Sequence, residues 1–341
     1  MKNTVKSDVA SDNSVTGISS ALLSGTFFRP SEFVTTTYSA LSYTDSIVEL
    51  AFEALAPYFA GDPLFMQLPE ICYETFDFPI ALVPTVPNCK VLELFGGPGA
   101  SCSDFGARFI ARMVSRLDPA SSLCAAVRTL AEANSFVCAF GGMKQVLYLD
   151  CPSSAVPSSL PENIVISDKI PDDAIAVDWR NTAFILGLSI PFVYAALHDA
   201  IEADRAFHSK EVFFSNFVIS QSHPELLEAV LFARSLGAPI GKIAVAESVS
   251  HEISDFLSGR CDAPESLSGL RLLFSDKELR ESLAAWSASD AEIEASFVRS
   301  LDKAGYVLPN KESAACEAVR FLHFPVQQSI VVMAELDASA D

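Results

Sequence analysis

The sequence predicts an α/β protein whose strands are parallel and lie in layers, divided into two domains. Short apolar runs that suit buried strands alternate with helical patterns, most clearly over residues 211–248. Half of the 341 residues are hydrophobic and 19% are charged, which suffices for a large core. A glycine-rich turn at 96–99 separates an apolar strand from a helix, an arrangement typical of a small-molecule site.

The first part of the chain is predicted to alternate helices and strands. Residues 43–60 have helical periodicity, and residues 90–95 form an apolar run that the glycine turn ends. Asp104 begins the next helix, where a carboxylate complements the positive end of the helix dipole. Residues 122–140 are predicted to form one helix, followed by a strand at 145–150.

An apolar segment in the middle of the chain raises the question of a membrane span. Residues 181–197 are mostly apolar, but they fall short of the ~20 residues that usually cross a bilayer. Pro191 lies in the middle of the segment. The pattern therefore favours a buried core helix with a kink over a membrane helix.

The second part of the chain repeats the strand–helix–strand rhythm of a parallel sheet. Strands are expected at 163–167, 211–220 and 242–248, with helices at 224–237, 290–305 and 312–322 and a final apolar run at 329–336. The predicted units are a flexible tail at 1–18, an N-terminal region at 19–95, a smaller α/β domain at 96–180 and a larger α/β domain at 181–341.

Composition limits the classes of partner. The net charge of −20 disfavours binding to nucleic acid or to an anionic membrane. Eight cysteines without a CxxC pair are typical of reduced thiols, and no leader with an apolar region is seen, so a cytoplasmic protein is expected. No zinc-ligand spacing is present, and no metal is expected on this basis.

The stretch LELFGGPGASCSDFGARF, residues 92–109, resembles the threonine synthase signature E-L-F-H-G-P-T-x-A-F-K-D-F-x-x-x-F. Further segments are similar to that family in the same order, including AVDWRNTAFILGLSIPFVYAAL at 176–197 and FVISQSHPELLEAVLFARSLG at 217–237. The likeness covers most of residues 20–335. It implies a trimmed version of the fold-type II pyridoxal phosphate (PLP) enzymes, which include the tryptophan synthase β type.

The departures from the family pattern bear on its chemistry. The Schiff-base lysine of the family falls on Ser103, whose hydroxyl cannot form an imine with the cofactor aldehyde. The glycine-rich loop S-G-D-T-G falls on residues 129–133, which contain no glycine, and S-G-N-F-G-D falls on residues 220–225. Asp178 replaces a family asparagine. The resemblance thus implies that PLP has been lost, that no other cofactor replaces it, and that the chain is not a functional PLP-dependent threonine synthase.

If the fold is kept, the inherited pocket lies between the two domains. Ser103 could be a nucleophile or a helix cap, and Cys102 could be a reactive thiol or a packed one. His223 could act as a base toward either of them or be a solvent-facing turn residue, and Asp178 could serve in acid–base work or be a surface carboxylate. The expected ligand-binding residues are Gly97, Gly99, Ser101, Asn134, Ser220 and Asn310.

Two functions remain open on the sequence. The first is a pseudoenzyme that acts as a binding, regulatory or complex-forming partner, and an apolar strip at 321–336 is a candidate contact face. The alternative is a repurposed, PLP-independent lyase, isomerase or cyclase that acts on a small metabolite or biosynthetic intermediate in the inherited cleft. The expected partner is a small molecule or another protein, and a homodimer is possible. A cleft filled by side chains would favour the first function, and an open polar cleft the second.

Overall fold

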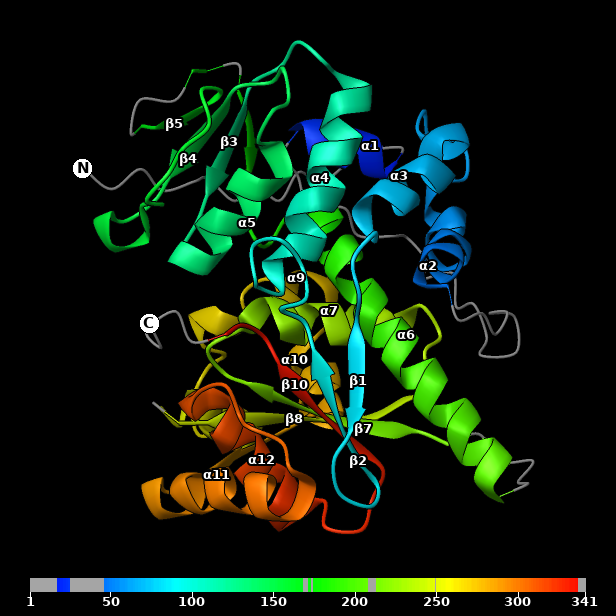
Figure 1. Ribbon diagram of the computed structural model, residues 1–341, viewed down its shortest axis with the longest axis vertical. Helices are drawn as coiled ribbons and strands as arrows, with labels where there is room; N and C mark the ends of the chain where they lie inside the picture. The colour runs from blue at the N-terminus through cyan, green and yellow to red at the C-terminus, as the bar shows by residue number, and fades with distance from the viewer. Residues whose placement is uncertain are drawn as a thin grey trace.

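The computed structural model describes residues 17–24, 46–167, 171–172, 174–207, 213–248 and 250–336. These residues form two β-sheets with helices packed around them (Figure 1). The predicted α/β class with layered parallel sheets is confirmed. Most of the predicted tail at 1–18 lies outside the described residues.

The larger sheet has six strands in the order β1-β2-β10-β7-β8-β9. The strands are β1 (Ala81–Pro84), β2 (Cys89–Glu93), β10 (Ser329–Met333), β7 (Ser215–Ser220), β8 (Ile240–Glu247) and β9 (Leu283–Ser287). β1 pairs antiparallel with β2, and every other pairing in this sheet is parallel. The C-terminal strand β10 is thus in the middle of the sheet, beside a strand from the first third of the chain.

The smaller sheet has four parallel strands in the order β5-β4-β3-β6. Its strands are β5 (Ile164–Ile166), β4 (Leu147–Asp150), β3 (Leu123–Ala126) and β6 (Ile175–Val177). This sheet lies within the range predicted for the smaller domain, whereas β1 and β2, from the predicted N-terminal region, belong to the larger sheet. The exact domain boundaries remain a prediction.

Twelve α-helices are described. They are α1 (Ile18–Ser24), α2 (Ile47–Leu55), α3 (Leu68–Thr75), α4 (Ser103–Leu117), α5 (Leu130–Phe140), α6 (Thr182–Phe207), α7 (Pro224–Ser235), α8 (Glu252–Leu257), α9 (Leu270–Leu273), α10 (Asp276–Ser282), α11 (Asp290–Ala304) and α12 (Lys311–His323). Capping boxes begin α10 at Ser275 and α11 at Ser289, and Gly305 ends α11 with a φ of 64° that favours glycine.

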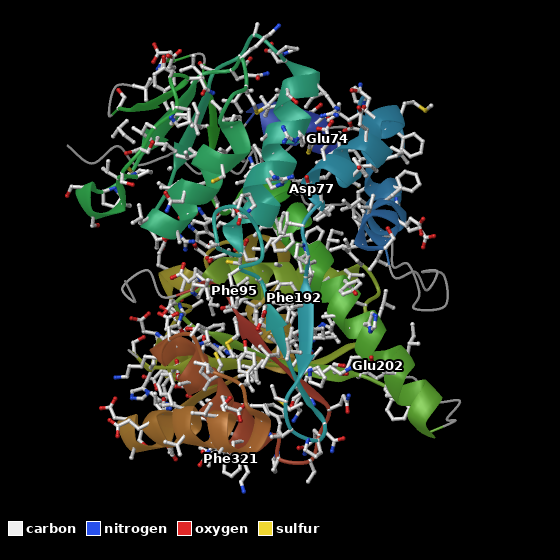
Figure 2. The ribbon with its side chains drawn as sticks, in the orientation of Figure 1. Glu74, Asp77, Phe95, Phe192, Glu202 and Phe321 are labelled. Carbon is white, nitrogen blue, oxygen red and sulfur yellow. The ribbon has the colours of Figure 1, made fainter. Side chains whose placement is uncertain are left out.

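Helix α6 runs from the centre of the molecule to its lower right edge in Figure 1. It packs against α4 and α7, and Phe192 on α6, labelled in Figure 2, lies 5.6 Å from Phe217 on β7, centroid to centroid. Residues 182–203 are apolar and long enough to cross a membrane, but 83% of the window is buried inside the protein. The segment is therefore the core helix that the sequence predicted, and Pro191 lies inside it.

One continuous apolar cluster reaches from the strands of the smaller sheet to those of the larger sheet. α6 and α7 supply much of it, and Phe184, Phe192 and Phe232 on these helices are at most 1% exposed. The far face of the larger sheet is covered by α12, with α11 outside it (Figure 1). The two sheets are thus held against each other by shared hydrophobic packing.

Several sequence-based expectations were wrong. Residues 122–140 do not form one helix, because 123–126 form strand β3 before α5 begins at Leu130. Strands β1, β6 and β9 were not predicted. The apolar strip at 321–336 is not one exposed face, since residues 329–333 are the buried strand β10. Phe321 and Leu322 are each 44% exposed and Val326 is 72% exposed (Figure 2 labels Phe321).

Candidate functional site

The candidate site is built from the N-terminal ends of four helices. Each of α4, α5, α7 and α12 carries a carboxylate in its first turn, and contacts described below join the helix starts. These carboxylates are Asp104, Glu132, Glu225 and Glu312. The first turn of a helix has unpaired N–H groups and the positive end of the dipole, and is therefore a common place for an anion.

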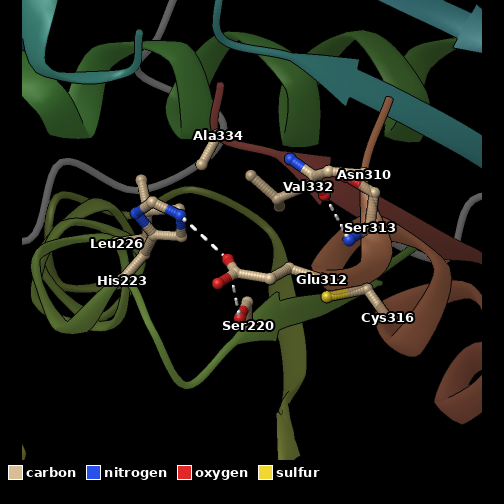
Figure 3. A pocket seen from close by; sticks show the side chains of 9 residues that line it. All are labelled: Ser220, His223, Leu226, Asn310, Glu312, Ser313, Cys316, Val332 and Ala334. Atoms are coloured by element: carbon tan, nitrogen blue, oxygen red, sulfur yellow. Dashed lines mark hydrogen bonds and ion pairs between the residues drawn. The ribbon is translucent and has the colours of Figure 1, made fainter. Parts of the chain in front are cut away.

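His223 is at the centre of the site, immediately before α7. Its Nδ1 is 3.0 Å from Oε1 of Glu225, and its Nε2 is 3.3 Å from Oε2 of Glu312 (Figure 3). Burial lowers the pKa of His223, but hydrogen bonds with Cys102, Glu225 and Glu312 outweigh burial and raise it well above its usual value. The ring is therefore an imidazolium held between two carboxylates. The side chain is 11% exposed, so the solvent-facing alternative for this histidine was wrong.

Glu225 is held as an anion by the same contacts. Burial raises the pKa of Glu225, but its hydrogen bond with His223 and the charges of His223 and Arg128 lower it to about 2. The carboxylate is at the start of α7, and Pro224 is the first residue of that helix. The helix dipole adds to the stabilisation of this negative charge.

Arg128 connects two of the helix starts. Its Nη2 is 2.8 Å from Oε2 of Glu225, and its Nε is 3.3 Å from Oε2 of Glu132. The backbone N–H of Arg128 also donates to Glu132 Oε2 at 2.8 Å. The guanidinium lies over Trp179, 4.8 Å from the ring centroid. The start of α5 is thus occupied by the protein's own carboxylate and arginine.

Cys102 is the N-cap residue of α4, with no capping hydrogen bond from its side chain, and it lies beside His223. Its side chain is buried, and its ligand atom lies within 4.8 Å of those of His223 and Glu225. Burial raises the pKa of the Cys102 thiol despite the neighbouring imidazolium. The protonated thiol is the dominant form, and the structure brings Cys102 and His223 together without activating the sulfur.

The glycine turn surrounds a carboxylate of the protein itself. The N–H of Gly99 donates to both carboxylate oxygens of Asp104, at 3.0 and 2.9 Å. A Cβ added at Gly97 would lie 2.4 Å from Asp104 Oδ2, so glycine is needed there for close approach. The backbone N–H that was expected to bind a ligand anion is already paired. Ser103 is the first residue of α4, and its N–H donates to Ser101 Oγ at 3.2 Å.

A small pocket lies beside this cluster (Figure 3). It is lined by Ser220, His223, Leu226, Asn310, Glu312, Ser313, Cys316, Val332 and Ala334. Its cavity volume, counted for the centres of water-sized spheres, is about 10 Å³. A volume of about 10–15 Å³ on this measure holds one water molecule. The pocket is therefore large enough for about one water molecule.

Of the expected ligand-binding residues, Ser220 and Asn310 line this pocket. Ser220 Oγ donates to Glu312 Oε2 at 3.4 Å, and Asn310 caps α12 by accepting from the N–H of Ser313 at 2.8 Å. Asn134 and Asp178 do not line it. Asp178 is paired instead with Arg180, at 2.7 Å from Nη2.

Arg128 and Glu312 were not predicted to belong to the site, while Glu132 and Glu225 fall in segments that the resemblance placed at the cofactor loops but were not among the candidate site residues. A glutamate in the first turn of a helix is a common capping choice and does not by itself indicate a site. Only the tertiary contacts show that three such glutamates surround one histidine and one arginine.

The two sheets and the helices packed around them match the fold of threonine synthases and other fold-type II PLP enzymes. Among solved structures, the chain is similar to threonine synthase from Escherichia coli, with a TM-score of 0.74 and 19% identity over 94% of this chain and 85% of that one. A PLP-bound threonine synthase from Brucella melitensis matches with a TM-score of 0.71 and 20% identity, over 94% and 86% of the two chains. Threonine synthase from yeast matches with a TM-score of 0.68 and 15% identity, over 93% and 84%.

No protein-family model matches the chain, and no curated protein matches its sequence. At these identities the likeness to threonine synthases shows a shared fold.

Proposed function

We propose that this chain keeps the threonine synthase fold without PLP chemistry and acts as a pseudoenzyme, a binding, regulatory or complex-forming partner. The observation that carries this proposal is the Arg128–Glu225–His223–Glu312 cluster, which occupies the helix starts where the fold would hold a cofactor. A cleft filled by side chains was the expectation for a pseudoenzyme.

The cofactor's phosphate is the first group that does not fit. By resemblance, the two phosphate-binding glycine segments fall on residues 129–133 and 220–225, and each contains a glutamate, Glu132 or Glu225, that forms an ion pair with Arg128. A phosphate dianion there would have to displace Glu132 or Glu225, both 2% exposed. The displaced glutamate would lose its charge-assisted hydrogen bond with the arginine, which is worth about 1.5–3 kcal/mol, and this loss opposes phosphate binding.

The cofactor's aldehyde does not fit either. The lysine of the family is replaced by Ser103, which is 3% exposed. Among the described residues, no lysine lines the pocket, and the described lysine closest in sequence to the pocket wall, Lys311, is paired with Asp290 at 2.8 Å. The pocket volume of about 10 Å³, which is much smaller than PLP, also argues against cofactor binding in this pocket.

The alternative, a repurposed enzyme, has less support. A thiol and an imidazole do meet at Cys102 and His223, as nucleophilic catalysis requires. However, the thiol is protonated and buried, and the imidazolium is held by two carboxylates, so it cannot accept a proton.

The test is PLP binding measured by absorbance after gel filtration, on the wild-type chain and on Ser103→Lys. Threonine synthase from Brucella melitensis, which binds PLP, is the positive control. We expect no retained cofactor absorbance for the wild-type chain. We also expect none for Ser103→Lys, because the lysine restores the amine while the glutamates still occupy the phosphate positions. Stoichiometric cofactor retained by the wild-type chain would overturn the proposal.

A further inference from the structure

Three side chains of the cluster form a donor set that metals use. Cys102 offers a thiolate, His223 an imidazole nitrogen and Glu225 a carboxylate oxygen, and the three ligand atoms lie within 4.8 Å of one another. Thiolate, imidazole and carboxylate are the ligands of zinc sites in proteins. Cys102 lies at the start of α4 and His223 at the start of α7, 121 positions later, so no short sequence motif contains all three ligands.

The spacing suits a tetrahedral ion. His223 Nδ1 and Glu225 Oε1 are 3.0 Å apart. Two ligands bound to Zn²⁺ at about 2.0–2.2 Å in tetrahedral geometry stand roughly 3.3–3.6 Å apart, so an ion needs only a small outward shift of the two side chains.

Two charged side chains that would not touch the ion already hold two of the three ligands in place. Glu312 lies 3.3 Å from the other ring nitrogen, Nε2, and Arg128 binds the second oxygen of Glu225 at 2.8 Å. A carboxylate on the free N–H of a ligating histidine is a recurrent feature of zinc sites. The nitrogen and the oxygen that face each other, Nδ1 and Oε1, are those left to bind the ion.

We propose that Cys102, His223 and Glu225 bind a divalent zinc-like cation. Binding displaces the thiol proton and the Nδ1 proton to solvent, and the ion then bonds to Sγ, Nδ1 and Oε1. A water is expected as the fourth ligand of the tetrahedron. The proposal goes beyond the proposed function, since metal binding and PLP binding are measured separately and either can fail alone.

The experiment strips the full-length protein with a chelator, dialyses it against Zn²⁺ or Co²⁺, and measures bound metal by mass spectrometry. We expect one ion per chain and, with Co²⁺, a thiolate-to-metal charge-transfer band. Cys102→Ser is expected to abolish the band. Cys316→Ser, which changes another buried thiol in the pocket wall, is the matched control and should keep it.

A further variant tests Glu312, the carboxylate beside Nε2 of His223. Glu312→Gln should lower metal affinity by about 10- to 100-fold while the stoichiometry stays at one. If Cys102→Ser does not fold, a wild-type Co²⁺ spectrum without a thiolate band still overturns the proposal. A wild-type chain without bound metal, or a thiolate band that survives in folded Cys102→Ser, would overturn the proposal.

Discussion

Glu228, one helical turn after Glu225 on α7, offers a quantitative test of the electrostatics of the site. The side chain is fully buried, and neither carboxylate oxygen has a hydrogen-bond partner. Burial raises the pKa of Glu228 well above its usual value, and the negative charges of Glu225 and Asp178 raise it further. The group is therefore a neutral carboxylic acid in the folded protein under conditions in which it ionises in the unfolded chain.

The sign of the effect follows from proton linkage. Above the usual carboxyl pKa the folded state holds a proton that the unfolded state has released, so the free energy of unfolding decreases as the pH rises. The decrease is about 1.4 kcal/mol per pH unit until the pH reaches the folded-state pKa of Glu228. Between about pH 5 and about pH 7 this group therefore lowers the stability of the wild-type chain by up to about 3 kcal/mol.

Glu228→Gln removes the titration and keeps the side-chain shape. Urea unfolding of both proteins at about pH 5 and about pH 7 gives the difference in their free energies of unfolding. We expect the free energy of unfolding of Glu228→Gln to increase relative to that of the wild type as the pH rises. Glu281→Gln, at an exposed glutamate near Lys277, is the control and should leave the pH dependence unchanged. Parallel stability–pH curves for wild type and Glu228→Gln would refute the assignment of a neutral buried carboxyl.

Three further expectations concern packing, charge and reactivity. Gly269→Ala should destabilise the fold by about 1–3 kcal/mol in thermal unfolding, and less in a Glu228→Ala background, because the new Cβ would lie 1.6 Å from Glu228 Oε1; an undiminished cost in the double variant would contradict this contact. Arg128→Ala should cost about 1.5–3 kcal/mol in urea unfolding, since it removes the charged partner of Glu132 and one of the two charged partners of Glu225, whereas Lys311→Ala, at an exposed ion pair, should leave the stability almost unchanged; equal effects would count against the cluster. In metal-free native protein Cys102 should react with a maleimide far more slowly than the exposed cysteines, as peptide mapping measures, and labelling at the same rate would show an open cleft.

Much of the fold could be predicted because strong local patterns agree with the tertiary structure. The run at 224–237 begins with Pro224 and ends at a glycine, and α7 follows it closely. Strand β3 was read as helix because Leu123–Ala126 contains no β-branched residue and adjoins a helix. Its extended form comes from parallel pairing with β4 and β6 on either side, which a local pattern does not contain.

The site could be predicted only in part. The sequence placed Cys102 and His223 at turns before helices, and the resemblance placed both at one cleft. The protonation state of each depends on burial and on charges from other elements. Arg128 comes from a position 97 residues before Glu225, and such a contact leaves no trace in spacing or periodicity. The charge cluster is therefore a property of the folded chain, and the sequence alone supplied only its parts.

The most direct test of the account is a crystal structure of the protein soaked with PLP. The account predicts the Glu225 carboxylate between Arg128 and His223 at the start of α7, with no cofactor density there. Density for PLP in the cleft, with its phosphate against Arg128 and the Glu225 side chain turned away, would contradict it.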